Sequence, residues 1–405
     1  MSRPRFSTML LAGLLTVVLI LVGAVLLLGR SEDPAGRTVV SVRLWDEQVA
    51  GAYRESFEAF HREHPDIEVR TTLVSYASYF DTLRTDVAGG GADDIFWINN
   101  SHFAEYADND RLMAITPSTD WEPSVVAQFT RGGQLCGVPQ LTDAGIALYY
   151  NADLLAAAGV DPSALGAARW DPDPAEDTLR PLLARLTVDT AGNRSGTTGF
   201  DPRKVRQWGY NAANDLQGIN LNYIGSAGGV FSDGDRFAFD NPGAVAGLRY
   251  VVDLINTEHV APPASDTNDN GDFSRNQFLS GKMAVFQSGT YNLAQVAEQA
   301  RFRWGVVMLP TGPAGRVSVT NGIVAAGNPA SRHPAAVRGV LDWLGGRGNE
   351  YLGRRGAAIP AVLSAQRVYF DYWKARGVDV TPFFAVLDGG RIDAPGGVGF
   401  AAGFA

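Results

Sequence analysis

Three strand-like runs alternate with two helix-like stretches near the start of the chain body, and this alternation constrains the fold more than any other feature. The runs are rich in β-branched and aromatic residues, which favour strands. They are VVSVRLW at 39–45, IEVRTTL at 67–73 and DIFWI at 94–98. The first helical stretch ends at Pro65 and the second at the glycines 89–91. A β-α-β-α-β order is typical of an α/β sheet that carries helices on its faces.

At 405 residues the chain is too long for one average core, so more than one domain is expected. Two apolar runs within 137–150 are separated by polar residues at 140–143, and such a break could carry the chain from one domain to the next. Further along, NPGAV at 241–245 is typical of a capped helix start. The apolar face expected on that helix comprises Val245, Leu248, Val251, Val252 and Ile255.

The N-terminus holds an uncharged, apolar stretch at 9–28 that is long enough to span a bilayer as a helix. Arg3 and Arg5 precede it, which should keep the start of the chain in the cytoplasm. The stretch is either a cleaved signal peptide or an uncleaved anchor, and its length favours the anchor. Both alternatives place the residues after about 37 outside the cytoplasm, behind a polar linker, SEDPAGR.

The charge and cysteine content exclude several classes of function. The formal net charge is −9, and the first thirty residues carry three arginines and no acid, so the body is acidic and nucleic acid is not an expected partner. Cys136 is the single cysteine, which excludes an internal disulfide or a thiolate metal cluster. The histidines of HREH at 61–64 have no evident third ligand, and GGGADD at 89–94 lacks the Lys-Ser/Thr of a phosphate loop. We therefore expect neither a metal nor a cofactor.

Six segments occur in an order and spacing that resemble a known family. They are RLWDEQVAGAYRESFEAFHREHPDIEV, GGGADDIFWINNSHFAEYADNDRLMAITP, GVPQLTDAGIALYYNADLLAAAGV, NPGAVAGLRYVVDLI, FLSGKMAVFQSGTY and WGVVMLPTGPAG. Together they resemble the extracellular solute-binding proteins (family 1) of the maltose-binding-protein type, which deliver carbohydrates to ABC importers. The resemblance covers roughly residues 40–365. It implies a type II periplasmic-binding-protein fold, in which two α/β lobes are joined by hinge crossovers.

The resemblance also implies a division of the chain. Residues 1–37 would be signal anchor and linker, 38–140 with 324–365 one lobe, and 141–323 with 366–405 the other. Crossovers would lie at 140–143 and 321–325. The chain departs from the family in two ways: it has no lipidated cysteine near the start, and its end, GGRIDAPGGVGFAAGFA, holds no long amphipathic helix.

A sugar site needs aromatic rings for the flat C–H faces and Asp, Glu, Asn or Gln for the hydroxyls. Most candidates with this chemistry follow strand ends, where ligands gather in open α/β sheets; Tyr291 stands at the family's position for a stacking aromatic. The predicted ligand-binding residues are Trp45, Asp46, Glu47, Trp97, Asn99, Asn100, Asp143, Gln217, Asn220, Asn222, Tyr291 and Asn321. The two tryptophans could instead belong to the core. The acids at 46–47 and the asparagines at 99–100 could instead cap helices.

The resemblance implies a receptor and not an enzyme: a monomer outside the cytoplasm that binds a mono- or oligosaccharide between its lobes and passes it to a membrane permease driven by an ATPase. Two alternatives stay open. One is a receptor for a polyamine or other non-sugar solute, since Asp46, Glu47 and Asp143 beside tryptophan faces would suit a cation. The other is an anchored glycoside hydrolase that uses Asp46 or Glu47 together with Asp143 as its catalytic pair.

Overall fold

The computed structural model describes residues 36–233, 236–268 and 270–393. Among these residues there is no helix that combines the length and apolarity needed to cross a membrane. The predicted anchor at 9–28 lies outside the described residues, so it stays a prediction.

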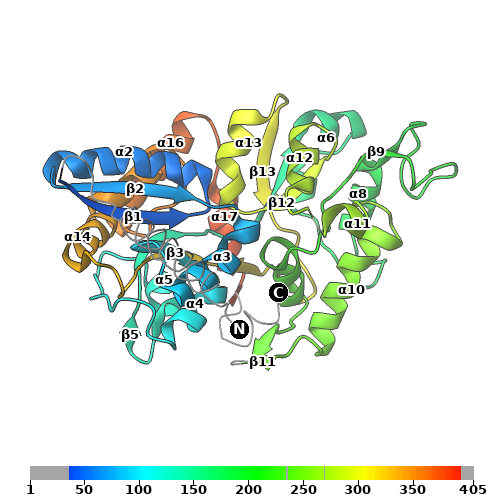
Figure 1. Ribbon diagram of the computed structural model, residues 1–405. Coiled ribbons are helices and arrows are strands. Elements are labelled where there is room, and N and C mark those ends of the chain that lie inside the picture. The colour runs from blue at the N-terminus through cyan, green and yellow to red at the C-terminus, as the bar shows by residue number, and fades with distance from the viewer. Residues whose placement is uncertain (1–35, 234–235, 269, 394–405) are drawn as a thin grey trace, which may run out of the picture.

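The first sheet has five strands in the order β2-β1-β3-β15-β6. These strands are β1 (Thr38–Leu44), β2 (Ile67–Leu73), β3 (Ile95–Asn99), β6 (Val138–Thr142) and β15 (Gly322–Gly327). Strand β1 is parallel to β2 and β3, whereas β15 runs antiparallel to both β3 and β6. The three predicted strands and the two helices between them, α2 (Glu47–Glu63) and α3 (Tyr76–Gly89), are confirmed. Figure 1 shows this sheet with α2 and α14 beside it.

The second sheet is a small antiparallel one in the order β12-β7-β13, from β7 (Ala147–Asn151), β12 (Val285–Ser288) and β13 (Trp304–Met308). It lies apart from the first sheet, on the other side of the molecule (Figure 1). Side chains of a strand alternate between its faces. On β7, Leu148 therefore joins one apolar cluster and Tyr149 another, so helices cover both faces.

The remaining elements surround these two sheets. They are α4 (Asn100–Ala107), α5 (Pro123–Gln128), β4 (Thr130–Arg131), β5 (Gln134–Leu135), α6 (Ala152–Ala158), α7 (Pro162–Gly166), α8 (Leu179–Leu186), β8 (Val188–Asp189), β9 (Val205–Gln207), η1 (Leu216–Asn220), α9 (Leu221–Ser226), β10 (Ser232–Asp233), β11 (Arg236–Phe237), α10 (Pro242–Asn256), α11 (Ala264–Thr267), α12 (Phe273–Leu279), η2 (Thr290–Asn292), α13 (Leu293–Gln299), β14 (Ser318–Thr320), α14 (Pro334–Leu344), η3 (Arg347–Asn349), α15 (Glu350–Arg354), η4 (Leu363–Ala365), α16 (Gln366–Ala375), α17 (Thr381–Ala385), η5 (Val386–Asp388) and β16 (Arg391–Asp393).

The apolar core is divided between the two sheets. One cluster draws its buried residues from 40–141 and 323–365 and covers the first sheet. Two further clusters lie on opposite faces of the second sheet. One of them includes Tyr369, Trp373 and Phe383, so α16 and α17 pack against the second sheet although they follow the last strand of the first.

Two segments of the chain pass side by side between the sheets. Strands β6 and β15 stay paired up to Thr142 and Gly322. Beyond that pair, residues 143–146 lead to β7, and Asn321 alone joins β14 to β15. The sequence placed the polar break at 140–143. In the structure the crossover runs over 143–146 instead. Gln140 is a fully buried residue of β6, and its side-chain oxygen accepts a hydrogen bond from the Tyr53 hydroxyl.

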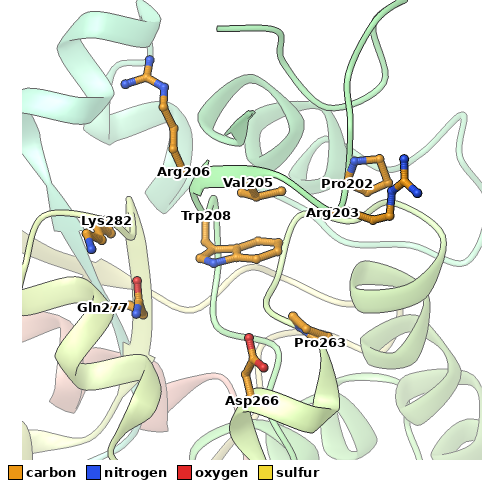
Figure 2. Close-up of a pocket in the computed structure, with 9 residues that line it drawn as sticks. All are labelled: Pro202, Arg203, Val205, Arg206, Trp208, Pro263, Asp266, Gln277 and Lys282. Carbon is orange, nitrogen blue, oxygen red and sulfur yellow. The ribbon is translucent and has the colours of Figure 1, made fainter. Parts of the chain in front are cut away.

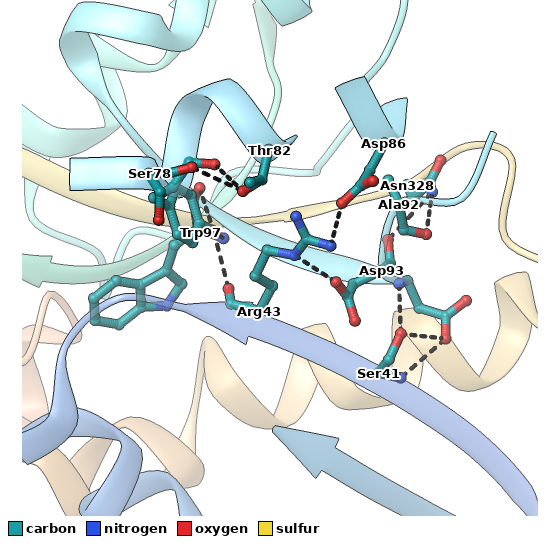
Figure 3. Close-up of polar contacts among 11 residues, drawn as sticks. Ser41, Arg43, Ser78, Thr82, Asp86, Ala92, Asp93, Trp97 and Asn328 are labelled. Atoms are coloured by element: carbon teal, nitrogen blue, oxygen red, sulfur yellow. Dashed lines mark hydrogen bonds and ion pairs between the residues drawn. The ribbon is translucent and has the colours of Figure 1, made fainter. Parts of the chain in front are cut away.

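Asp86 of α3 and the two acids of GGGADD hold α3 and the start of β3 against β1 (Figure 3). Gly90 ends α3 in the left-handed conformation, with φ of 73°. Arg43 of β1 is 8% exposed and forms ion pairs of 2.6 Å with both Asp86 of α3 and Asp93. Asp94 accepts hydrogen bonds from the backbone and hydroxyl of Ser41. The two carboxylates at 93–94 therefore serve the fold and not a ligand.

Helix α10 begins as predicted, but only part of the predicted face is buried: Val251 is buried and Leu248 and Ile255 pack against the core. The two valines Val245 and Val252 are 41% and 50% exposed. The buried face runs through Ala244 and Gly247, because α9 approaches so closely that a Cβ at Gly247 would lie 2.5 Å from the Tyr223 carbonyl oxygen. The buried face thus combines small residues at the contact with α9 and large ones such as Tyr250 and Leu254, and the pattern of large apolar residues did not reveal the small ones.

Asn241 caps α10 and also holds the preceding hairpin. Its side-chain oxygen accepts from the Ala244 amide at 3.0 Å, and its Nδ2 donates to the Val230 and Ala238 carbonyls at 2.7 Å. We expect Asn241→Ala to lower the free energy of unfolding by about 1–2 kcal/mol, since it removes a cap and two further bonds. Asn241→Asp keeps the capping acceptor and should lose less. Urea unfolding of both variants measures this; equal losses would contradict a capping role.

Candidate functional site

An aromatic cluster stands at the end of β1. Trp45 is half-buried, and its ring makes edge contacts with Tyr76, Tyr79 and Trp97 at centroid distances of 5.5, 4.8 and 5.0 Å. Tyr76 begins α3 and is 53% exposed. These two rings therefore present aromatic surface to water on a base of buried rings, which is the arrangement that a stacking platform requires.

Trp97 belongs to that buried base. It is fully buried, and its indole N–H donates to the Tyr53 hydroxyl at 3.0 Å, which in turn donates to Gln140 at 2.6 Å. With its one donor satisfied and its ring covered, Trp97 supports Trp45 and is not offered to a ligand. The structural interpretation thus replaces the predicted ligand contact at this residue.

Residues that cap helices occupy the adjacent strand ends. Asp46 caps α2, accepting from the Val49 amide at 2.9 Å, and Glu47 is exposed in the first turn. Asn99 is buried and caps α4, while its Nδ2 donates to the Tyr76 hydroxyl at 3.2 Å. Asn100, the first residue of α4, is half-buried. Asp46 and Asn99 are therefore helix caps. A cap uses one lone pair of a side-chain oxygen, so further lone pairs of Asp46 and an amide hydrogen of Asn99 are left for a ligand.

Asp143 lies where the chain leaves the first sheet. Burial disfavours its charged form and raises its pKa to about 7, and the negative charge of Asp46 adds to the effect. Burial likewise raises the pKa of Asp46, against the backbone hydrogen bonds that lower it. The carboxyl group that begins α2 and the one that begins the crossover are therefore close enough to repel each other.

The second sheet's side contributes an acid that the sequence did not single out. Asp215 caps the π-helix η1, accepting from the Gly218 amide at 2.8 Å; the residue is exposed to water, yet desolvation by the surrounding protein raises its pKa. π-Helices are rare in proteins, and those that do occur are often found at functional sites. The sequence signal was weak: an Asp two residues before Gln217, within the polar loop from which Gln217 and Asn220 were predicted.

Tyr291 brings these acids together. It is 39% exposed, yet desolvation by the surrounding protein raises its pKa, with further contributions from the charges of Asp215 and Asp143. Tyr76, on the first sheet's side, shows the same combination, and the charge of Asp215 again contributes. Asp46, Tyr76, Asp143, Asp215 and Tyr291, termed here the acidic–aromatic group, thus converge from both sides of the molecule, accessible to water but largely surrounded by protein.

The predicted amides behave differently from one another. Nδ2 of Asn321 lies 3.5 Å from Oε1 of Gln217, so both stand beside the crossovers. Asn220 is half-buried and donates to Asn214 at 3.1 Å on its own loop. Asn222 is 3% exposed, and both ends of its amide are bonded within the protein. Gln217 and Asn321 remain candidates for a ligand, whereas Asn222 does not.

Comparison with known proteins agrees with this architecture. The model of the family described as bacterial extracellular solute-binding protein matches residues 46–351. The chain belongs to this family.

Two solved structures and one curated relative are similar to this solute-binding protein, each to a different extent. The crystal structure of UspC from M. tuberculosis is 72% identical, with a TM-score of 0.72 over 90% of this chain and 92% of that one. The ABC substrate-binding protein Lmo0181 from Listeria monocytogenes, in complex with cycloalternan, is 18% identical, with a TM-score of 0.75 over 90% of each chain. A probable ABC transporter-binding protein of Deinococcus radiodurans is 28% identical over 230 residues, 55% of this chain and 50% of the relative. The chain thus matches about half the length of that curated relative.

The predicted two-lobed periplasmic-binding-protein fold is confirmed by these similarities. The family and the solved structures are binding proteins and not enzymes. Family membership also implies a location outside the cytoplasm.

The charges that act on the acidic–aromatic group of this solute-binding protein are all negative. Asp46 is influenced by Glu47, Asp143 by Asp46, and Tyr291 by the two other acids. Among the described residues, no group of His, Cys, Asp and Glu has the geometry to hold a metal ion. The arrangement can accept hydrogen bonds and attract a cation, and it offers aromatic faces.

Two surface cavities lie away from this group. One, of about 440 Å³, is lined by Trp208, Asp266, Gln277 and Lys282 among others, on the side of the second sheet (Figure 2). The other, of about 260 Å³, lies between α2 and the α14–α15 region beside Trp343. Neither cavity includes a predicted ligand-binding residue.

His102 supports the aromatic cluster at the end of β1, and its burial predicts a pH-dependent stability. Its ring is stacked on Phe80 at 3.6 Å, and burial lowers its pKa to about 4. Between that value and the usual value near 6.5, the unfolded chain binds more protons, so His102 makes the protein less stable as the pH falls through this window. We expect His102→Gln to flatten this dependence by about 1–2 kcal/mol between pH 7 and 4.5. Urea unfolding across that range measures it, and the exposed His333→Gln is the control; parallel curves for His102→Gln and the wild type would contradict the prediction.

Proposed function

We propose that this solute-binding protein is the receptor of an ABC importer and binds a carbohydrate in a cleft between its lobes. The observation that carries the proposal is the acidic–aromatic group, in which Asp46 and Tyr76 belong to one side of the molecule and Asp215 and Tyr291 to the other. The proposed lobes are residues 38–140 with 324–365 and residues 141–323 with 366–405, of which 394–405 lie outside the described residues. The complex of the Listeria protein with cycloalternan, a carbohydrate, supports the ligand class.

Each residue of the proposed site has a role that sugar chemistry requires. Exposed rings stack on the C–H faces, and acids and amides accept or donate to the hydroxyls. The stacking residues are Trp45, Tyr76 and Tyr291. The hydrogen-bonding residues are Asp46, Asn99, Asn100, Asp143, Asp215, Gln217 and Asn321, with Glu47 and Asn220 at the rim.

Lobe closure is part of the proposal. A ligand that contacts both lobes shifts the equilibrium towards a closed form by as much as it prefers that form. The 72% identical UspC structure superposes overall no better than the 18% identical Listeria structure. Since chains that are 72% identical should share the fold of each lobe, this favours a difference in how the two lobes are oriented. The closed form would then dock, as a monomer held by the N-terminal helix, on a permease driven by an ATPase.

A second candidate ligand is a solute that carries a positive charge, either an amino sugar or a polyamine. The observation that favours it is that the charges acting on Asp46, Asp143 and Tyr291 are all negative. An ammonium group placed among these acids would relieve their repulsion and lower the pKa of Asp143, whereas a neutral sugar would not.

Calorimetric titration with matched solutes tests both candidates. Glucose against glucosamine differs in one amino group, and maltotriose and spermidine extend the comparison to an oligosaccharide and a polyamine. Binding of any of the three sugars supports the carbohydrate receptor, and binding of glucosamine without glucose supports the charged class. Binding of spermidine alone would overturn the carbohydrate assignment. Release of reducing ends from an oligosaccharide would overturn the assignment as a non-enzyme.

A further inference from the structure

Asn222 joins the loop that carries two proposed ligand contacts to the segment between the lobes. Its Nδ2 donates to the Gln217 carbonyl oxygen at 2.7 Å, inside η1. Its Oδ1 accepts from the Ser318 hydroxyl at 3.2 Å and from the Val319 amide at 3.1 Å, both in β14. One buried side chain therefore ties η1, with Asp215 at its start, to a crossover strand.

Ser318 extends this connection to the other crossover. Its hydroxyl oxygen accepts from the Ile146 amide at 2.7 Å, and its side chain is fully buried. The two crossovers meet again one step nearer the first lobe, where the Asp143 amide donates to the Asn321 carbonyl oxygen at 2.8 Å. Beyond that contact, the chain enters the paired strands β6 and β15.

The contacts leave only a short stretch of each crossover between two fixed ends. On one end the first sheet holds the pair Thr142 and Gly322. On the other end the bonds of Asn222 and Ser318 hold residues 146 and 318 to η1. The Gly145 amide donates to the Phe383 carbonyl oxygen at 2.7 Å, and β14 pairs with β16 as far as Thr320, so these positions are also held on the second lobe's side. The backbone left between the two fixed ends is 143–144 and Asn321, and it includes the proposed ligand residues Asp143 and Asn321.

We propose that Asn222 is a positioning residue: through Ser318 it makes the second lobe's ligand-bearing loop and the second-lobe ends of both crossovers one rigid unit, so that the lobes bend relative to each other at Asp143 and Asn321. The inference rests on the proposed function, because Asp143 and Asn321 are ligand contacts only under that function and both lie at the bend. A solute held by Asp143 then acts directly on the angle between the lobes. Asn222, predicted from the sequence to touch the ligand, acts on it through Asp215 and Gln217.

The test measures the distance between the lobes without any ligand, so its outcome does not depend on the proposed function. Spin labels are attached to Glu58→Cys on α2 and Glu298→Cys on α13, both exposed positions, in full-length protein that carries Cys136→Ser. Pulsed electron paramagnetic resonance then gives the distribution of distances. The variants compared are Asn222→Ala and Ser318→Ala, singly and together.

We expect each single variant to broaden the distance distribution at least twofold, and the double variant to be no broader than the singles, because both remove the same connection. The matched control is Asn292→Ala, a buried asparagine of the same lobe that bonds Ser288 and not the crossovers. It should leave the distribution unchanged. A merely structural asparagine would lower the unfolding temperature without changing the width, and an unchanged width in folded Ser318→Ala would overturn the proposal. Ser318→Ala carries the test even where Asn222→Ala does not fold.

Discussion

Asp143→Ala is expected to weaken binding of the carbohydrate ligand by about 30- to 150-fold, which corresponds to about 2–3 kcal/mol. The reason is that sugar hydroxyls or an ammonium group would be buried in the closed form opposite a lost acceptor. Isothermal titration calorimetry measures the change. Asp266→Ala is the matched control, since Asp266 is an acid of the same lobe that lies at the separate surface cavity. Unchanged affinity in Asp143→Ala would remove this residue from the site.

The same residue should oppose stability in the absence of ligand. The pKa of Asp143 is raised to about 7 in the folded protein by burial. Between the usual value of about 4 and 7 the folded state binds more protons than the unfolded chain, so stability falls as the pH rises through this window and the full loss is present above pH 7.

We therefore expect Asp143→Asn to raise the free energy of unfolding of the unliganded protein by about 1–2 kcal/mol at pH 8, and to have little effect at pH 4. Urea unfolding at the two pH values measures the difference. A variant that is less stable than the wild type at pH 8 would show that Asp143 is not destabilised by its surroundings.

Arg43→Ala is expected to have the largest effect on the fold, a loss of about 3–5 kcal/mol in the free energy of unfolding. Arg43 is buried, and its removal leaves the carboxylates of Asp86 and Asp93 facing each other without their shared cation. The value should lie near the lower end, because Asp86 is partly exposed and water can reach it.

A matched control for Arg43 lies on α3. Arg84 forms a partly exposed ion pair with Glu105 at 2.8 Å, and Arg84→Ala should cost less than about 1 kcal/mol. Guanidinium chloride unfolding of the two variants gives the comparison. Similar losses in both would mean that burial of the pair at Arg43 adds nothing to stability.

Local pattern was sufficient for the strands and helices of the first lobe. The runs at 39–45, 67–73 and 94–98 became β1, β2 and β3 because β-branched and aromatic side chains suit a pleated, buried surface whatever the rest of the chain does. Pattern was not sufficient for the face of α10, where the close approach of α9 at Gly247 outweighed two valines.

The candidate site likewise contains residues that the sequence identified and residues that only the structure identified. Trp45 and Trp97 both stand at or near strand ends and were indistinguishable in the sequence. The structure distinguishes them, because the Trp97 indole donates to the hydroxyl of Tyr53 on α2, and that hydroxyl in turn donates to Gln140 on β6. Tyr76 and Asp215 were missed because neither belongs to a local motif. Each became part of the site through a residue far away in the chain.

By itself, the sequence determined the alternation of strands and helices, the acidic character of the body, and the chemical types available at the strand ends. These depend on hydrogen bonding and side-chain spacing within a few residues. Only the tertiary structure decided that Asp46 acts on Asp143 and that Asp143 and Asp215 both act on Tyr291, since these residues are many positions apart in the chain. Water access and desolvation at one site depend on the packing of both lobes, and no local pattern carries that information.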